Sequence, residues 1–254
     1  MLQTKAMVIL VLSDLHIDCH DNFSIFGWNE QDFIERIEYL RDKHNIDKVI
    51  FNGDVFELLK YRFDEVRAAN PLLFRYFEAN RDFIFIKGNH DFVLDFTVDN
   101  YRITNSKGQI IHIEHGHNAD WLNGKRIGRA LGKFGFSILK RMSASSMMMN
   151  LYFRIVAYDD QINHIPKRYN TLRYLTYALK LLKDSDVVIL GHTHKLEAHH
   201  TYYLNRKKRY LNSGVCSMGR LQGIIMDTET LQYEFLNETS EWLKMSSEII
   251  AMAI

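Results

Sequence analysis

Several features are scarce or absent in this 254-residue sequence, and each absence narrows the range of functions. The chain has only two cysteines, Cys19 and Cys216, which are too few for a disulfide framework and favour a reducing compartment. No run approaches the roughly 18 apolar residues of a transmembrane helix. The apolar run after Lys5 is too short for a secretory signal. These absences predict a cytoplasmic protein.

A strong charge of either sign is also missing, because the formal net charge is only +1. This near balance argues against a dedicated nucleic-acid binder, although a local basic patch such as 206–209 is compatible with it. The composition, 46% hydrophobic and 25% charged, is ordinary for a globular protein. Because the chain has no internal repeat or low-complexity segment, residues 1–254 are expected to form a single domain.

The first structural signal is an unbroken apolar run, Val8–Leu12, of the kind found in strands buried on both faces. Asp14 and His16 follow it directly, two residues apart. In an extended chain such residues point the same way, and open α/β sheets place their sites just past the carboxyl ends of strands. The sequence therefore predicts an oxygen ligand and a nitrogen ligand at the mouth of the first strand.

The same arrangement recurs along the chain. Further strands are expected at 47–51, 82–86, 109–113 and 186–190, with helices at 30–44, 64–79 and 172–183. Pro71 is expected to break or kink the second helix. Three strand–helix units in series predict a parallel, doubly wound sheet. The strands end in carboxylate, amide or imidazole side chains: Asp54, Asn89, His90, His115, His192 and His194. A role in a turn or a helix cap would explain such a side chain at the end of one strand, but not at the ends of several successive strands.

Seven of these strand-end residues are candidate metal ligands: Asp14, His16, Asp54, Asn89, His115, His192 and His194. Oxygens mixed with imidazoles suit Mn²⁺, Fe, Zn²⁺ or Mg²⁺ better than Ca²⁺. Seven ligands are too many for one ion and fit two, with Asp54 as the bridging carboxylate. Two ions about 3.5–4 Å apart would clamp a phosphoryl group and lower the pKa of a shared water, aligned to attack phosphorus opposite the leaving oxygen. The neighbouring His90 would donate a proton to the leaving group or stabilise the phosphoryl oxygens.

These blocks, in this order, resemble the motif set of the calcineurin-like metallophosphoesterases. The blocks are Asp14-Leu15-His16, Gly53-Asp54, Gly88-Asn89-His90-Asp91, His115-Gly116-His117 and Gly191-His192-Thr193-His194. The resemblance implies an α/β fold, the four-layer α/β/β/α sandwich, with a dinuclear centre in which Mn²⁺ is the leading candidate. It implies two ligand sets that share Asp54, namely Asp14, His16, Asp54 and His194 for one ion, and Asp54, Asn89, His115 and His192 for the other. His90 matches the family's catalytic histidine.

Within the family, the chain resembles the bacterial branch that includes UDP-2,3-diacylglucosamine hydrolase. The similarity lies in the size, in Gly53-Asp54-Val55-Phe56-Glu57 and in an insertion after the His-Gly block. It implies a phosphorylated small-molecule or lipid-linked substrate and peripheral contact with the inner membrane face. The hydrolase pattern has arginine after the Gly-Asn pair, where this chain has His90. That departure favours a generic phosphodiesterase or phosphomonoesterase.

A helical insertion is expected at about 119–170, where the strand pattern stops. No acid occurs between Asp120 and Asp159, and the segment is basic, apolar and rich in methionine. Three roles are open: a lid packed on the body, a cap that orients an anionic lipid-like substrate through Arg126 and Arg129, or a dimer interface. The apolar tail, 238–254, is either a packed final helix or a membrane-surface anchor.

The remaining expectations concern loops and hairpins. Three aromatic residues in the loop 19–29, Phe23, Phe26 and Trp28, either line a pocket or pack under the loop. A hairpin is expected at 197–212 with its turn at 205–208, and a second hairpin at 222–236.

Two rival functions are weighed against an active phosphoesterase. A non-catalytic interaction module on the same fold would have lost ligands or the catalytic histidine, whereas this chain keeps all seven ligands and His90. A nuclease would need a basic groove that leads to the ions. We therefore expect an enzyme that hydrolyses a phosphodiester, a pyrophosphate or a phosphomonoester.

Overall fold

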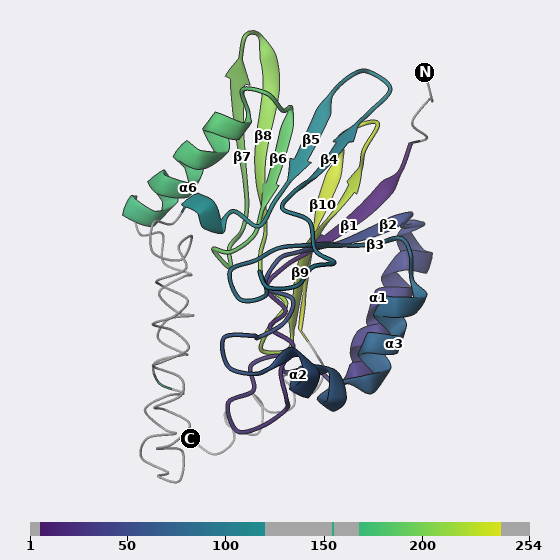
Figure 1. The fold of residues 1–254 in the computed structure, drawn as a ribbon. Helices are drawn as coiled ribbons and strands as arrows, with labels where there is room; N and C mark the ends of the chain where they lie inside the picture. The colour runs from purple at the N-terminus through teal and green to yellow at the C-terminus, as the bar shows by residue number, and fades with distance from the viewer. Residues whose placement is uncertain (1–5, 120–153, 155–167, 240–254) are drawn as a thin grey trace, which may run out of the picture.

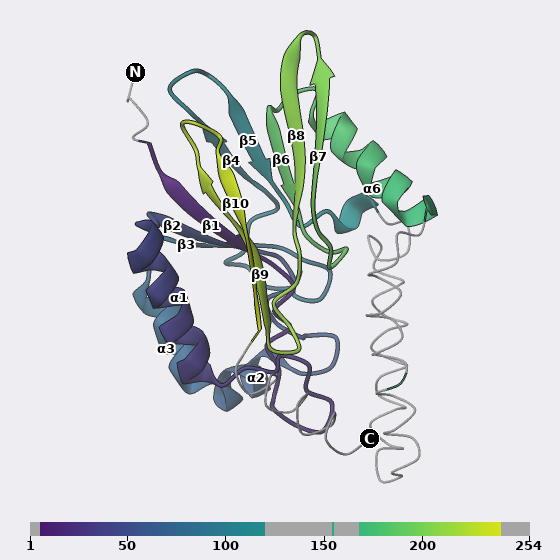
Figure 2. The same ribbon diagram turned by 180° about the vertical axis from the view of Figure 1, so that it is seen from behind.

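The computed structural model describes residues 6–119, 154 and 168–239. Two five-stranded sheets pack face to face in these residues, with helices on the outer face of each sheet (Figures 1 and 2). The fold is therefore the expected four-layer α/β/β/α sandwich. Its elements are β1 (Val8–Leu12), α1 (Glu30–His44), β2 (Lys48–Asn52), α2 (Phe63–Ala69), α3 (Pro71–Ala79), β3 (Phe83–Ile86), β4 (Tyr101–Thr104), β5 (Ile110–Ile113), η1 (His117–Ala119), α6 (Arg168–Leu181), β6 (Val187–Leu190), β7 (Leu196–Tyr203), β8 (Arg206–Ser213), β9 (Arg220–Asp227) and β10 (Tyr233–Thr239).

Both sheets are mixed, so the prediction of one parallel, doubly wound sheet is wrong. The first sheet has the order β10-β9-β1-β2-β3, in which β1, β2 and β3 are parallel and the hairpin β9–β10 is antiparallel to β1. The second sheet has the order β4-β5-β6-β8-β7. The C-terminal hairpin returns to pair with β1, which a local strand–helix pattern does not reveal. The edge strand β4 was not predicted, and only Ile103 of its four residues is buried.

The first strand separates two hydrophobic cores. Ile9 and Val11 face the second sheet, whereas Leu10 and Leu12 face the layer of α1 and α3. All four side chains are fully buried, which explains why the run shows no alternation of apolar and polar residues. The strand therefore emerges from the centre of the sandwich, and the residues that follow it begin at a buried position.

The predicted break at Pro71 is confirmed. Pro71 is the first residue of α3, and α2 ends at Ala69. Proline fits the first turn of a helix because the N–H that it lacks would have no partner within the helix. Asn70 lies between the two helices and donates from Nδ2 to the carbonyl oxygens of Asp18 and Val66. The contact with Asp18 ties the helix pair to the loop that follows β1.

The aromatic residues of the loop 19–29 pack under it rather than line a pocket. Phe23, Phe26 and Trp28 are all buried, and the rings of Phe26 and Trp28 lie 5.5 Å and 5.8 Å from the ring of Phe33 in α1. The loop is thus anchored to the hydrophobic core of the first sheet.

The β7–β8 hairpin turns earlier than predicted. Its two turn residues are Leu204 and Asn205, with φ of 50° and 60°, so the predicted turn at 205–208 is wrong. Lys208 is buried rather than solvated: its Nζ donates to the carbonyl oxygen of Ser185 at 2.8 Å and lies 3.2 Å from Asp186 Oδ1. Two-residue turns with positive φ at both positions favour asparagine and glycine. Leucine at the first position therefore carries a conformational cost.

Leu204→Asn should stabilise the protein, because asparagine tolerates the left-handed region better than leucine does. The Leu204 side chain is 80% exposed, so little packing is lost. We expect the free energy of unfolding to increase by about 1 kcal/mol and Tm to rise by about 2–4 °C. Leu204→Ala is the control, since alanine is equally strained there. An equal Tm for the wild type and Leu204→Asn would contradict a strained turn.

No helix within 6–119 or 168–239 is long and apolar enough to cross a membrane. Most of the predicted insertion, about 119–170, lies outside the described residues, as do Arg126 and Arg129. The same holds for most of the tail 238–254. Its first two residues, Glu238 and Thr239, belong to β10 and not to a helix.

Candidate metal centre

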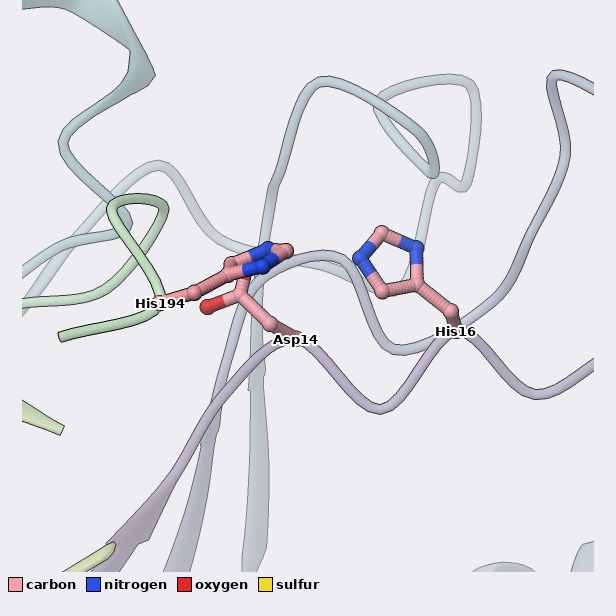
Figure 3. A group of neighbouring side chains, drawn as sticks. All are labelled: Asp14, His16 and His194. Carbon is pink, nitrogen blue, oxygen red and sulfur yellow. The ribbon is translucent and has the colours of Figure 1, made fainter. Parts of the chain in front are cut away.

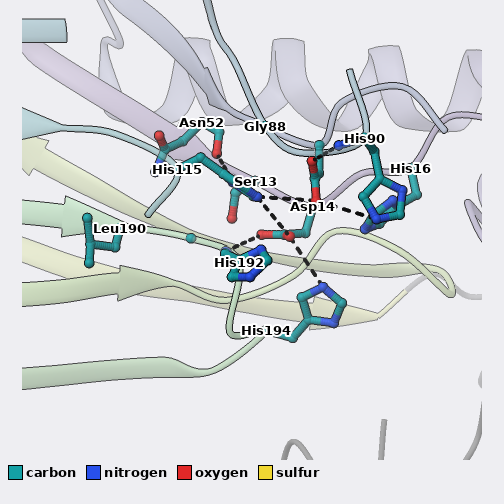
Figure 4. A network of polar contacts seen from close by, with 12 residues as sticks. Ser13, Asp14, His16, Asn52, Gly88, His90, His115, Leu190, His192 and His194 are labelled. Atoms are coloured by element: carbon teal, nitrogen blue, oxygen red, sulfur yellow. Dashed lines mark hydrogen bonds and ion pairs between the residues drawn. The ribbon is translucent and has the colours of Figure 1, made fainter. Parts of the chain in front are cut away.

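Six of the seven predicted ligands come together where the strand ends of the two sheets meet (Figure 4), and the seventh, Asn89, is buried in the loop after β3. The first sheet supplies candidate ligands from the loops after β1, β2 and β3, and the second sheet supplies candidate ligands from the loops after β5 and β6. In chain order these residues are Asp14, His16, Asp54, Asn89, His115, His192 and His194. Asp14, Asp54 and His115 are almost completely buried. The site is therefore built from both layers of the sandwich.

Five of the predicted ligands have a left-handed backbone. Their φ angles lie between 52° and 66°, and the residues are Asp14, His16, Asp54, His192 and His194. The expectation that Asp14 and His16 continue an extended strand is therefore wrong, because the chain has left strand geometry by Asp14. Non-glycine residues in this region cost about 1 kcal/mol or more each. Such residues cluster at functional sites, where the surrounding structure holds them in place.

The first group of ligands consists of Asp14, His16 and His194 (Figure 3). Asp14 Oδ1 lies 3.2 Å from His194 Nε2, and Asp14 Oδ2 accepts a hydrogen bond from the backbone N–H of His192 at 3.0 Å. One ligand atom of each of the three residues lies within 4.8 Å of the others. The backbone bond thus fixes one carboxylate oxygen and leaves the other directed at the imidazoles.

The second group consists of Asp54, His115 and His192. Asp54 Oδ1 accepts a hydrogen bond from the backbone N–H of His90 at 2.8 Å, and Asp54 Oδ2 lies 3.2 Å from His115 Nε2. His115 Nδ1 donates to the carbonyl oxygen of Asn52 at 2.8 Å. In the neutral ring this bond leaves the lone pair on Nε2, which also lies 3.9 Å from Asp14 Oδ1. His115 therefore links the two groups.

Four of the predicted ligands have a side-chain atom that is buried without a hydrogen-bond partner: Asp14 Oδ1, His16 Nδ1, Asn89 Oδ1 and His115 Nε2. Buried polar atoms are almost always paired, because leaving one unpaired costs free energy. Carboxylate, amide and imidazole donors are the set that Mn²⁺, Fe and Zn²⁺ accept. Atoms that share an ion at roughly 2.0–2.2 Å lie about 3 Å apart, close to the 3.2 Å of both carboxylate–imidazole pairs. The residues present therefore fit a pair of divalent ions.

The charges in the centre depend on one another. Burial alone would raise the pKa of Asp14 and Asp54, but the neighbouring histidines, His115 above all, hold the pKa of both carboxyls well below the usual range. Burial opposes a charged His115, yet Asp54 and Asp14 raise its pKa to about 10. Burial and the charge of His115 lower the pKa of His192 to about 3. Without ions, the carboxylates and the histidine His115 therefore favour each other's charged forms.

Glu57 belongs to the site although it was not predicted as a site residue. Glu57 Oε1 accepts a hydrogen bond from His90 Nδ1 at 2.8 Å, and Glu57 Oε2 lies 3.4 Å from His16 Nδ1. The side chain is 1% exposed. Burial opposes a charged His90, but Glu57 and Asp54 raise its pKa to about 9. The one signal in the sequence is its position three residues after Asp54, since nothing local shows that it turns toward His90.

Two motif glycines are required by the packing of the ligands. A Cβ on Gly88 would lie 2.1 Å from Asp54 Oδ1, and a Cβ on Gly53 would lie 2.5 Å from the ring of His115. Asp91 closes the same loops by accepting hydrogen bonds from the N–H groups of Gly88 and Val55, both at 2.7 Å. Burial and the charge of Asp54 raise the pKa of Asp91 to about 6. The Gly-Asp and Gly-Asn-His motifs therefore keep two loops close enough to share one site.

The sequence model of the calcineurin-like phosphoesterase family matches residues 7–196. Because this match spans most of the chain, the protein belongs to the calcineurin-like phosphoesterase family. The matched range contains every predicted ligand, from Asp14 to His194. A comparison with curated proteins finds none that matches.

Three solved structures are similar to this chain at low sequence identity. A hypothetical protein from Pyrococcus horikoshii is 12% identical, with 97% of this chain and 93% of that chain covered and a TM-score of 0.50. Vps29 from Chaetomium thermophilum is 15% identical, with coverage of 93% and 97% and a TM-score of 0.42. A dimetal phosphatase from Danio rerio is 8% identical, with coverage of 91% and 98% and a TM-score of 0.47. At these identities the likeness concerns the fold alone.

Metal affinity should increase with pH. Only the neutral imidazole binds an ion, so His115, with its pKa raised to about 10, must release a proton when the ion enters. Isothermal titration calorimetry with Zn²⁺ between about pH 6 and 9, in two buffers of different ionisation enthalpy, measures both the affinity and the protons released. His44→Gln is the control, because His44 pairs with Glu234 on the surface. A pH-independent affinity without proton release would contradict this account.

Proposed function

We propose that this protein is an active, metal-dependent phosphoesterase that hydrolyses a phosphodiester, a pyrophosphate or a phosphomonoester. The observation that carries the proposal is the pair of ligand groups around Asp14 and Asp54, together with the buried, unpartnered ligand atoms between them. Two divalent ions, when bound, polarise the phosphoryl group and lower the pKa of a coordinated water. Mn²⁺ is the ion that we propose first, since mixed oxygen and imidazole ligands accept it.

The chain's own residues have distinct tasks in this reaction. The backbone N–H groups of His90 and His192 hold one oxygen of Asp54 and Asp14, respectively, so that the other oxygen of each stays available to an ion. Glu57 fixes the ring of His90 through Nδ1, and His90 Nε2 lies 3.9 Å from Asp54 Oδ2. Without ions, Glu57 and Asp54 raise the pKa of His90 to about 9, and both carboxylates favour its protonated form. His90 can therefore donate its Nε2 proton to the leaving oxygen.

The substrate is the finer part of the proposal. The resemblance to UDP-2,3-diacylglucosamine hydrolase suggests a lipid-linked pyrophosphate, whereas His90 after the Gly-Asn pair suggests a simpler ester. Hydrolysis by the Mn²⁺-loaded protein of a UDP-linked diacylglucosamine, bis(p-nitrophenyl) phosphate and p-nitrophenyl phosphate compares the three classes. Preference for the lipid supports the hydrolase branch, and preference for either small ester excludes it. If the protein binds no Mn²⁺ and hydrolyses none of the three compounds, the result would support a non-catalytic interaction module.

Asp54→Ala should remove both ions and all activity, because the carboxylate is proposed to bridge them. Metal content after dialysis, measured by inductively coupled plasma mass spectrometry, should fall from two ions per chain toward none. Asp82→Ala is the control, since Asp82 pairs with Arg41 of α1 and precedes β3, whereas the candidate ligands follow the ends of strands. Retention of both ions by Asp54→Ala would refute the bridging role.

His90→Ala should keep both ions and lower kcat by about 10²–10⁴-fold, the usual scale for a lost proton donor. An unchanged kcat in His90→Ala would assign the proton transfer to another group.

Glu57→Gln should shift the high-pH limb of the kcat profile to lower pH, because the charge of Glu57 helps to raise the pKa of His90. A purely structural role for Glu57 would change the rate without moving that limb.

A further inference from the structure

The tip of the β7–β8 hairpin carries the most exposed large apolar side chain among the described residues. Leu204 is 80% exposed, and its neighbours Tyr202 and Tyr203 are 74% and 43% exposed. Arg206 and Lys207 follow directly and are exposed as well. These five residues, with Asn205 between them, are called the hairpin tip below.

Neither the backbone conformation nor the packing of the turn favours leucine at position 204. Its φ of 50° lies in a region that leucine rarely adopts, and its side chain gains almost no burial in return. Asparagine or glycine at this position would form the same turn at a lower cost. A residue that is strained and also exposed is better explained by a contact that this chain makes with something else.

The strand register arranges the tip's side chains around Leu204. Tyr202 pairs with Lys207 across the hairpin, and Tyr203 pairs with Arg206. Because successive side chains point to opposite faces of a strand, each face of the hairpin presents one tyrosine beside one cation. Leu204 therefore lies at the apex, with one tyrosine and one cation below it on each face of the hairpin.

The tip carries two exposed cations, Arg206 and Lys207, and no acid in the neighbouring sequence. The sequence from Ala198 to Arg209 contains no aspartate or glutamate. Slight burial and then the charges of Lys207 and Arg209 on β8 lower the pKa of His200 on the facing strand, β7. The two cations at the tip are thus available to an anionic partner.

We propose that the hairpin tip docks on an anionic phospholipid surface, with Leu204 inserted among the acyl chains. Tyr202 and Tyr203 would lie at the level of the headgroups, where amphipathic rings are favoured, and Arg206 and Lys207 would contact lipid phosphates. Nucleic acid fits less well. The tip is a convex apex rather than a groove, and its tyrosines lie on opposite faces and cannot form one stacking platform.

The tip lies at the end of the sandwich opposite to the metal centre (Figures 1 and 2). β8 is parallel to β6 and pairs Arg209 with Val187, the first residue of β6, whereas His192 and His194 follow the last residue of β6. Membrane docking through the tip is therefore separate from the chemistry of the site and does not depend on the proposed function.

Co-sedimentation of the full chain with vesicles tests the proposal. Vesicles of phosphatidylcholine with about one third phosphatidylglycerol are compared with vesicles of phosphatidylcholine alone. We expect binding to the anionic vesicles only, weakened by salt. Leu204→Asn should weaken binding by about tenfold, and Arg206→Gln and Lys207→Gln by about fivefold each. Tm reports that the variants are folded.

Matched controls separate the tip from a general surface effect. Leu72→Asn removes an exposed leucine from α3, and Lys43→Gln removes an exposed cation from the end of α1; both variants should bind vesicles as the wild type does. In a Leu204→Trp variant, lipids brominated on their acyl chains should quench the added fluorescence. Absence of wild-type binding, equal binding by Leu204→Asn, or an unquenched Trp would each overturn the proposal. Binding to a single-stranded homopolymer in place of vesicles would overturn it in favour of nucleic acid.

Discussion

The charge of two buried carboxylates is the constraint on which the rest of the structure depends. Asp14 and Asp54 are almost completely buried, and both lie within 4 Å of the same imidazole nitrogen, Nε2 of His115. Burying such charges without compensation costs several kcal/mol each. The histidines around them supply that compensation when no ion is bound, and Asp14 Oδ1 and Asn89 Oδ1 are buried without a hydrogen-bond partner. The positions of the loops follow from this requirement.

Strands of both sheets end at the same side of the sandwich, so loops from both layers surround the two carboxylates. His115 follows β5 of the second sheet but donates to the carbonyl oxygen of Asn52, the last residue of β2 in the first sheet. Likewise, the backbone N–H of His192, after β6, donates to Asp14, after β1. Both hydrogen bonds run from a donor of the second sheet to an acceptor of the first. The same hydrogen bonds therefore hold the two sheets together and fix the geometry of the site.

The sequence predicted what depends on local pattern. The helix Glu30–His44 and the strand Val8–Leu12 have the predicted bounds, because their apolar spacing records directly which faces are buried. The chemistry of the strand ends also predicted which residues would gather at one edge. The order of the strands was beyond such reasoning, since the pairing of β1 with β9 joins segments more than 200 residues apart. The left-handed backbone at Asp14 and His16 was hidden as well, because neither residue type demands it.

The errors at the β7–β8 hairpin and at Glu57 have a common physical origin. Polar residues at 205–208 favoured a turn there, but Lys208 finds two oxygen partners inside the protein, and the turn moves to Leu204 and Asn205. Glu57 likewise has the composition of a surface residue and is buried because His90 and His16 lie beside it. In both cases a long-range polar contact outweighs local preference.

The origin of the ligands in both sheets gives a bound ion a mechanical role. An ion held by Asp14, His16 and His194 would link the loop after the first β-strand to a loop that comes about 180 residues later. Such a link would oppose sliding of one sheet over the other. Because an ion that binds only the folded chain stabilises it in proportion to the logarithm of its concentration, the supply of metal would set the thermal tolerance of the whole sandwich.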